Sequence, residues 1–271
     1  MTQVFQGNAR SNSILVVENL VKSFGGVAAV NNCSFEVRRG SITGLIGPNG
    51  AGKSTVVNLI SGALKPDSGK VLFNDEVISG KAPYEIGNRG LIRTFQISRE
   101  FPDMTVLENL VVAARNQSGE KLINVLFRPS LGRREEQKIV DKALLTLDTF
   151  GLYPLRNEYA GNLSGGQKRL LELARGIMAE PELLLLDEPM AGVNPALIER
   201  LGEHILELNK TLGITFVLVE HNLEIVEEIC QEVIVVALGS TLAVGTMADL
   251  RKNPAVVEAY LGGDVHERVG S

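Results

Sequence analysis

The run from Gly47 to Thr55 limits what this chain can fold into more than any other feature. It reads Gly-Pro-Asn-Gly-Ala-Gly-Lys-Ser-Thr and fits the pattern G-x-x-x-x-G-K-[ST]. Glycines let a backbone turn tightly and approach a bound anion closely. The apolar run Ser41–Ile46 before the loop is typical of a buried strand, and Val56–Ile60 after it continues an apolar helix. Because a helix N-terminus attracts phosphate, we expect an α/β chain that binds a nucleotide.

Two side chains of this loop carry the chemistry expected toward a nucleotide. Lys53 can reach the β- and γ-phosphates, and the Ser54 hydroxyl can ligate Mg²⁺. The loop positions expected to contact the nucleotide are Gly47, Asn49, Gly50, Ala51, Gly52, Lys53, Ser54 and Thr55.

The composition is that of an ordinary globular protein. Hydrophobic residues make up 44% and charged residues 22% of the 271 residues, which allows one large domain or two small ones. No apolar stretch approaches the length that crosses a bilayer, so we expect a soluble, cytoplasmic chain that meets a membrane only through partners. The formal net charge of −5 argues against a broad nucleic-acid surface.

Two groups of strands are predicted around the loop. Ile14–Val17, Cys33–Val37 and Lys70–Asn74 suggest an antiparallel sheet near it. After residue 182, continuous apolar strands alternate with helical patterns, which indicates a parallel sheet covered on both faces. These segments are Leu183–Leu186, Leu197–Leu208, Ile214–Val219, Leu223–Ile229 and Val233–Leu238.

The stretch from Gln96 to Asn162 has a different character and is expected to form an inserted helical subdomain. Val106–Ala114 and Ile139–Phe150 have helical apolar spacing. The basic cluster Arg128–Arg134 is interrupted by a proline and a glycine and is expected to be a solvated loop leading into the second helix. The expected organisation is one domain over residues 13–262, with 13–95 and 163–262 as the α/β core, 96–162 as the helical subdomain, and flexible tails over 1–12 and 263–271.

Two adjacent carboxylates, Asp187 and Glu188, end the first of the later strands. Ligands in open α/β sheets bind at the carboxyl ends of strands, so both are expected to face the phosphates. Asp187 suits a Mg²⁺ site because this cation prefers oxygen ligands. Glu188 is placed to orient or deprotonate an attacking water.

Two further polar residues are candidates because of their positions. His221 follows the strand Ile214–Val219 at the sheet edge where the acidic pair lies, and is a candidate catalytic residue. Gln96, after the run Arg93–Phe95, can bridge a metal or a water to the helical insert.

A second anion-binding helix start is predicted at Leu163–Gln167, which reads Leu-Ser-Gly-Gly-Gln. One nucleotide rarely needs two such sites from one chain. We therefore expect a head-to-tail dimer in which each chain caps the nucleotide bound by the other, through Ser164, Gly165, Gly166 and Gln167. The alternative is an ordinary serine N-cap followed by flexible glycines.

In their order along the chain, these motifs resemble those of the ATP-binding-cassette ATPase family. Gly47–Thr55 resembles its Walker A loop, Gln96 its Q-loop, Leu163–Gln167 its signature, Leu183–Asp187 its Walker B strand, Glu188 its catalytic glutamate and His221 its switch histidine. The resemblance covers about residues 13 to 262. It implies a P-loop NTPase core with an antiparallel β subdomain and an inserted helical subdomain, and ATP and Mg²⁺ as cofactors. It also implies an ATP-closed dimer, with Lys53 and Gln96 among the catalytic residues and Gln96 also a metal ligand. Phe24 would stack on adenine, where many relatives carry Tyr.

One departure and several short runs are similar to a subgroup of that family. In Ala191–Pro195, Asn194 stands where the family usually has Asp, which keeps a hydrogen-bonding side chain but removes a charge. Together with Arg93–Gln96, Leu126–Ser130, Ala160–Leu163 and Ala259–Gly263, this is similar to the ATP-binding subunit of high-affinity branched-chain amino acid importers.

The resemblance implies a peripheral ATP-hydrolysing motor on the cytoplasmic face of the inner membrane. Its implied partners are a second ABC ATPase subunit, in a homodimer or a heterodimer, and transmembrane permease subunits that dock near Phe101–Leu110 of this chain. A solute-binding protein is an indirect partner, and no nucleic acid is implied. Alternatives are a transporter of urea, amides or aromatic acids, lipopolysaccharide export, and a soluble ABC ATPase without a transport role. A non-hydrolysing regulatory binder is disfavoured because the full set of catalytic residues is present.

Overall fold

The structure is a computed structural model that describes residues 12–94, 100–115 and 129–267, with the backbone alone over 129–134 and 261–267. The chain divides into two compact units. The first comprises residues 1–91, 182–189 and 205–271, and the second comprises 92–181 and 190–204. The second unit therefore takes in more of the chain than the 96–162 insert expected from the sequence.

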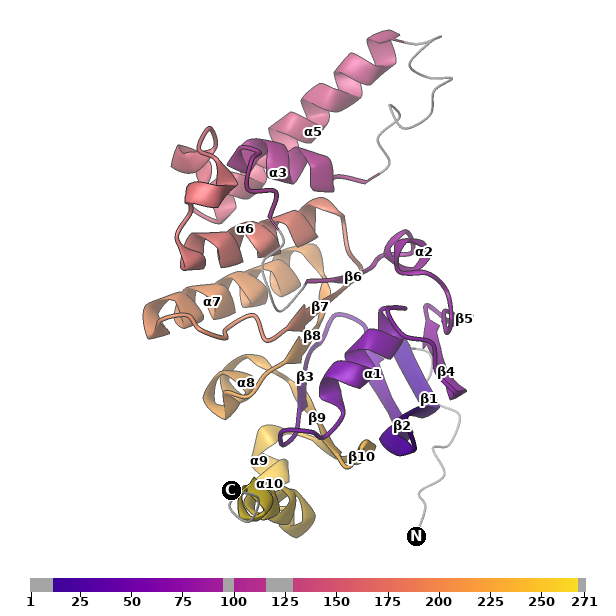
Figure 1. Cartoon of the computed structure of the whole chain (residues 1–271). Coiled ribbons are helices and arrows are strands. Elements are labelled where there is room, and N and C mark those ends of the chain that lie inside the picture. The colour runs from indigo at the N-terminus through magenta and orange to yellow at the C-terminus, as the bar shows by residue number, and fades with distance from the viewer. Residues whose placement is uncertain (1–11, 95–99, 116–128, 268–271) are drawn as a thin grey trace. The chain divides into compact units, whose positions relative to one another are not determined.

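An antiparallel sheet forms one layer of the first unit (Figure 1). Its strands are β1 (Ser13–Phe24), β2 (Val27–Arg38), β4 (Ser68–Phe73) and β5 (Glu76–Val77), in the order β2-β1-β4-β5. Gly25 and Gly26, with φ of 52° and 88°, form the two-residue turn between β1 and β2, since a tight hairpin needs positive φ at both positions. The predicted antiparallel sheet is thus confirmed.

The second sheet is mainly parallel. Its strands are β3 (Ile42–Ile46), β6 (Leu91–Arg93), β7 (Leu183–Asp187), β8 (Thr215–Val219), β9 (Glu232–Ala237) and β10 (Ser240–Gly245), in the order β10-β9-β3-β8-β7-β6. β3 pairs in parallel with β8 and β9, β7 pairs in parallel with β8, and β10 pairs antiparallel with β9. Every residue of β3, β7 and β8 is buried, which explains their continuous apolar runs.

The helices of the first unit are α1 (Lys53–Ile60), α2 (Pro83–Gly87), the second half of α7 (Pro195–Leu212), α8 (Leu223–Ile229), α9 (Met247–Leu250) and α10 (Pro254–Glu267). α1 lies between the two sheets (Figure 1), and its Val56, Val57 and Ile60 belong to one buried cluster with side chains of both. This packing fixes where α1 begins, and therefore where the preceding loop lies. α10 continues to Glu267, so residues 263–267 are helical although a polar tail was expected.

In the second unit, the described regular structure is mainly helical, with the end of β6 as its strand residues. It contains α3 (Val106–Ala113), α5 (Pro129–Thr149), α6 (Gly165–Met178), short 3-10 turns at Tyr153–Leu155 and Ala160–Asn162, and the first part of α7. α6 packs against both α3 and α5. This packing explains why the unit extends beyond Asn162. No helix of the described residues is long and apolar enough to cross a membrane.

Helix α5 corrects one prediction. The cluster Arg128–Arg134 was expected to form a loop, but α5 begins at Pro129. Proline is favoured in the first turn of a helix, because the N–H groups there have no partner within the helix. The proline therefore marks where the helix starts.

Candidate active site

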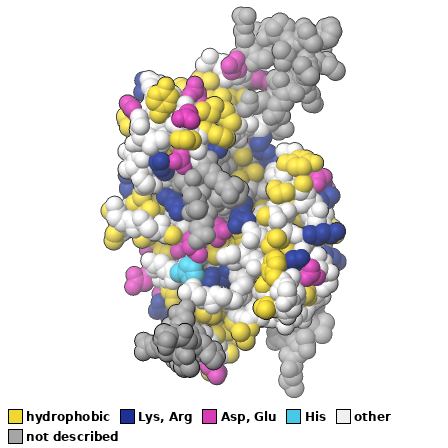
Figure 2. Space-filling model, in the orientation of Figure 1, with side chains coloured by type: hydrophobic (Ala, Val, Ile, Leu, Met, Phe, Trp, Pro, Cys, Tyr) yellow, Lys and Arg dark blue, Asp and Glu magenta, His cyan; other side chains and the backbone are white. Residues whose placement is uncertain are grey.

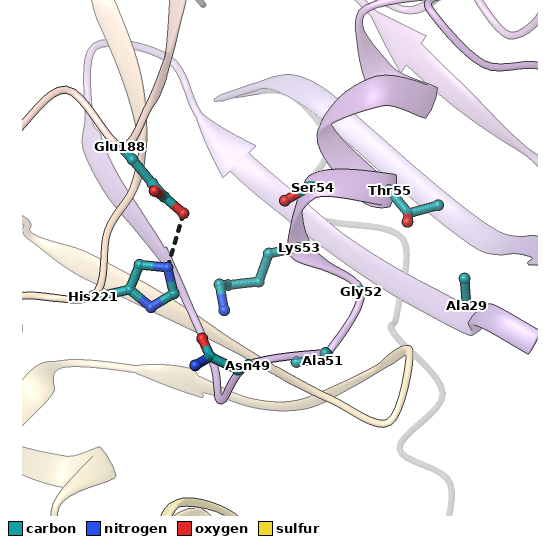
Figure 3. Close-up of a pocket in the computed structure, with 10 residues that line it drawn as sticks. Ala29, Asn49, Ala51, Gly52, Lys53, Ser54, Thr55, Glu188 and His221 are labelled. Atoms are coloured by element: carbon teal, nitrogen blue, oxygen red, sulfur yellow. Dashed lines mark hydrogen bonds and ion pairs between the residues drawn. The ribbon is translucent and has the colours of Figure 1, made fainter. Parts of the chain in front are cut away.

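The loop between β3 and α1 lines a pocket of the first unit (Figure 3). The lining residues are Ala29, Asn49, Gly50, Ala51, Gly52, Lys53, Ser54, Thr55, Glu188 and His221. Ala29, on β2, is the one lining residue that sequence reasoning did not predict. Glu188 and His221 lie more than 130 positions along the chain from the loop, and the pocket brings them together with it.

Two glycines let the loop pass between β2 and β9. A Cβ atom on Gly47 would lie 2.1 Å from the carbonyl oxygen of Val236, and one on Gly52 would lie 2.4 Å from that of Ala29. Gly52 is also the N-cap of α1, with a φ of 99° that side chains rarely allow. Gly47 packs behind the loop and does not line the pocket. Because α1 starts at Lys53, its first N–H groups have no partner within the helix and are suited to an anion.

Lys53 holds its positive charge inside the loop. Its Nζ donates to the carbonyl oxygens of Gly47 at 2.7 Å and Pro48 at 2.9 Å. Figure 3 shows the ammonium on the side of the loop toward His221. Burial lowers the pKa of Lys53, and the charge of Glu188 partly opposes that shift. A buried cation in this place is suited to bind phosphate oxygens.

Glu188 and His221 form a pair at the edge of the same pocket. Glu188 Oε1 lies 2.8 Å from His221 Nε2, and the backbone N–H of Glu188 donates to Val219 at 2.9 Å. Glu188 has a φ of 51°, a conformation that is unfavourable for a residue with a side chain and is kept where the surroundings impose it. The turn directly after β7 thereby directs the carboxylate toward the histidine. The predicted proximity of these two residues is present in the structure.

Asp187 and Ser54 are the described candidates for a Mg²⁺ site. Asp187 is the last residue of β7, is only 4% exposed, and is not one of the residues that line the pocket. Ser54, in the first turn of α1, lines the pocket. In nucleotide sites, Mg²⁺ is bound by one or two protein oxygens and completes its coordination with substrate phosphates and waters. The Asp187 carboxylate and the Ser54 hydroxyl are oxygen donors of this kind. No group of three His, Cys, Asp or Glu that could hold a metal alone occurs in the described residues.

Two other predicted site residues have different outcomes. Phe24, at the end of β1, is 48% exposed and does not line the pocket. Lys22 Nζ lies 5.7 Å from the centroid of its ring. Gln96 lies outside the described residues.

The predicted helix start at Leu163–Gln167 forms in the second unit. Ser164 Oγ accepts from the Gln167 N–H at 3.3 Å, and Gln167 Oε1 accepts from the Ser164 N–H at 2.9 Å. This reciprocal capping box is also what an ordinary serine N-cap would form. A Cβ on Gly165 would meet nothing within 4 Å, whereas one on Gly166 would lie 2.5 Å from Leu197 of α7.

Asn194 has a structural role at the start of α7. Its Oδ1 accepts from the N–H of Leu197 at 2.9 Å, as a helix N-cap does. An uncharged amide is sufficient for this bond. The departure from aspartate at this position therefore leaves the helix cap intact.

The chain is similar to known proteins over nearly its whole length. A model of the ABC transporter family matches residues 30–191, and a model described as branched-chain amino acid ATP-binding cassette transporter matches residues 240–266. The probable branched-chain amino acid transport ATP-binding protein LivG of Archaeoglobus fulgidus is 45% identical over 251 residues, which are 92% of this chain and 95% of that protein. The high-affinity branched-chain amino acid transport ATP-binding protein LivG of Escherichia coli strain K12 is 42% identical over 252 residues, 93% of this chain and 99% of its own length.

Solved structures resemble the fold over nearly the whole chain. A nucleotide-free ATP-binding cassette from an ABC transporter gives a TM-score of 0.78 at 40% identity and covers 91% of this chain and 98% of its own. A cassette of an ABC transporter in its ADP conformation gives a TM-score of 0.79 at 40% identity, covering 92% and 99%.

Proposed function

Because the chain belongs to the ABC transporter family, whose ATP-binding cassettes are ATPases, we propose that it is the ATP-hydrolysing subunit of an importer of branched-chain amino acids. The observation that carries the ATPase part is the pocket itself. A phosphate-binding loop at the N-terminus of α1 faces a carboxylate and a histidine that lie 2.8 Å apart.

The described site residues each have their own role in the proposed hydrolysis. Lys53 and the first N–H groups of α1 bind the phosphates and hold the terminal one toward Glu188. Glu188 accepts the proton of the attacking water, and His221 keeps that carboxylate oriented through the 2.8 Å contact. Ser54 and Asp187 would hold Mg²⁺, which supplies positive charge to the phosphates during transfer. We assign Gln96 the role of linking this site to the helical unit.

The second helix start supports a dimer. Ser164 and Gly165 are exposed, and the space around the Gly165 backbone would let a phosphate approach closely. We propose that the Ser164–Gln167 segment of one chain caps the nucleotide held by Gly47–Thr55 of another. Because both segments occur once in this chain, a head-to-tail pair would enclose two nucleotides. The second subunit is a copy of this chain or a similar ATPase.

The solute follows from the relatives and not from the site. The A. fulgidus and E. coli proteins are described as acting in branched-chain amino acid transport, and they match this chain nearly end to end. The separate match over residues 240–266 points to the same subgroup. We therefore assign the chain to the inner face of the membrane, where it works on permease subunits that receive solute from a binding protein.

Uptake of labelled leucine by intact cells tests this proposal. Cells that lack the chain should lose energy-dependent leucine uptake at low external leucine. The wild-type chain should restore it, and the Glu188→Gln variant should not. Glu182→Gln is the matched control, because Glu182 directly precedes β7 and is exposed in an ion pair with Arg39 at 3.0 Å. This control should restore uptake fully.

Other outcomes of the same assay distinguish the alternatives. Normal leucine uptake together with lost uptake of urea, a short amide or an aromatic acid would replace the solute assignment and keep the importer. If none of these uptakes depends on the chain, the importer proposal is wrong.

A further inference from the structure

One carboxylate holds the end of strand β1. Asp67, which precedes β4, donates its backbone N–H to the carbonyl oxygen of Val21 at 2.9 Å. Its carboxylate accepts from Lys22 Nζ at 2.7 Å and from the Ser23 N–H at 2.7 Å. Asp67 therefore binds three consecutive residues of β1, and the next residue is Phe24.

These bonds occur where the strand pairing is irregular. The register between β1 and β2 shifts between Leu20 and Lys22 and again between Lys22 and Ser23. Such bulges disturb the ladder and leave a backbone group to be satisfied in another way. Asp67 satisfies the Ser23 N–H, and both hydrogen bonds lower the pKa of its carboxyl, so the group is a charged acceptor. The end of β1 is thus held by a side chain of the segment that precedes β4.

The position of Phe24 has little other support. Its ring is 48% exposed, and its cross-strand partner Val27 is 71% exposed. The two residues between them are the glycines of the turn, which have no side chains to pack. Figure 2 shows hydrophobic and basic side chains together on the surface of the part that holds β1, β2 and β4. Lys22, 5.7 Å from the ring centroid and 2.7 Å from Asp67, connects the ring to the carboxylate.

The same hairpin reaches the phosphate loop. Ala29 lies two residues beyond Val27 on β2 and lines the pocket. Its carbonyl oxygen packs against Gly52, where a Cβ would lie only 2.4 Å away. The hairpin is therefore anchored to the loop through Ala29, and its tip presents Phe24.

We propose that Asp67 is a positioning residue for the base of the bound nucleotide. It fixes the end of β1 so that Phe24 stacks on adenine while the phosphates lie in the loop. This inference rests on the proposed function, because it takes ATP as the ligand of the pocket.

Calorimetric titration tests the proposal with two ligands in buffer without Mg²⁺, so that no hydrolysis occurs. ATP offers phosphates and a base, whereas inorganic tripolyphosphate offers phosphates alone. The Asp67→Ala variant should bind ATP about threefold to tenfold more weakly, a part of what stacking of a base on an aromatic ring contributes. It should bind tripolyphosphate as the wild type does.

A double variant separates positioning from a general structural effect. The losses of two residues that act through one contact do not add. The variant that combines Asp67→Ala with Phe24→Ala should therefore bind ATP no more weakly than Phe24→Ala alone. Glu18→Ala is the matched control, because Glu18 pairs with Lys70 at 3.0 Å across the same two strands, and its ATP affinity should be unchanged. If Asp67→Ala does not fold, Asp67→Leu replaces it in every arm, since its side chain has a similar shape but no oxygen for Lys22 or the Ser23 N–H.

Three results would overturn the proposal: unchanged ATP affinity in the Asp67 variant, an equal loss of tripolyphosphate affinity, or additive losses in the double variant. Failure of the wild-type chain to bind ATP would have a different meaning, since it would refute the ATPase part of the proposed function, on which this inference rests.

Discussion

Replacing Glu188 by glutamine should abolish hydrolysis and leave nucleotide binding intact. The two side chains have the same shape, so the contact to His221, 2.8 Å in the wild type, can persist. The amide cannot accept the proton of an attacking water. A positioned general base contributes about 10²–10⁴-fold in rate, so we expect kcat to fall by that factor, or by about 2.7–5.4 kcal/mol in the barrier.

The electrostatics of the pocket predict the effect on binding. Glu188 lines the same pocket as Lys53 and its charge raises the Lys53 pKa, so the two interact. A negative charge there also repels phosphates. Removing it should leave the ATP dissociation constant unchanged or lower it.

Phosphate release at saturating Mg-ATP measures the first effect, and calorimetric ATP titration measures the second. Glu182→Gln, at the other end of the same strand, should hydrolyse ATP at the wild-type rate. If Glu188→Gln kept more than about a tenth of the wild-type kcat, Glu188 would not be the general base. A loss of ATP affinity as large as the loss of rate would show instead that the substitution damages the site.

Three further predictions follow from the same geometry. Glu188→Gln with ATP should elute as a dimer in size-exclusion chromatography with light scattering, and a monomer at saturating ATP would refute the head-to-tail pair. ATP affinity should fall as the pH rises through the Lys53 pKa, because only the charged amine attracts phosphates; burial places this pKa below the ordinary value of 10.5. The Lys53→Met variant should bind ATP weakly at every pH, and identical pH profiles of the variant and the wild type would contradict the role of Lys53. Gly47→Ala should lower the free energy of unfolding in urea titrations by about 1–3 kcal/mol, because the new Cβ would overlap the carbonyl oxygen of Val236, whereas Gly165→Ala should change it little. If the two variants unfold at the same urea concentration, the close packing of the loop is refuted.

The parts of the site that could be predicted from the sequence are local patterns. The glycine-rich loop lies between a strand and a helix as expected, since its neighbouring apolar runs carry that signal. Glu188 and His221 each follow a buried apolar strand, and β7 and β8 pair in parallel. Their polar ends therefore meet at one edge of the sheet.

Other features depend on contacts between distant residues and could not be predicted in this way. The approach of Ala29 to Gly52 depends on how the β1–β2 hairpin packs on the loop. The bond from Asp67 to the Ser23 N–H joins residues 44 positions apart, at a bulge that no residue pattern marks. The positive φ of Glu188 is imposed by the turn after β7.

The boundaries were the least predictable part. The expected α/β core, residues 163–262, includes α6, whereas α6 packs on α3 and α5 in the second unit. Pro129 was interpreted as a break, although a proline in a first turn is compatible with a helix start. Both differences concern where an element belongs or begins, and neither changes the residues of the pocket.

Hydrolysis by the assembled transporter tests the central claim most directly. The tagged chain would be purified from gently solubilised membranes with the proteins that accompany it and reconstituted in liposomes. Our account predicts that ATP hydrolysis by this complex rises when its solute-binding protein carries leucine, isoleucine or valine, and that Glu188→Gln abolishes the increase. A complex without membrane-spanning subunits, or a hydrolysis rate that is the same with and without these amino acids, would contradict it.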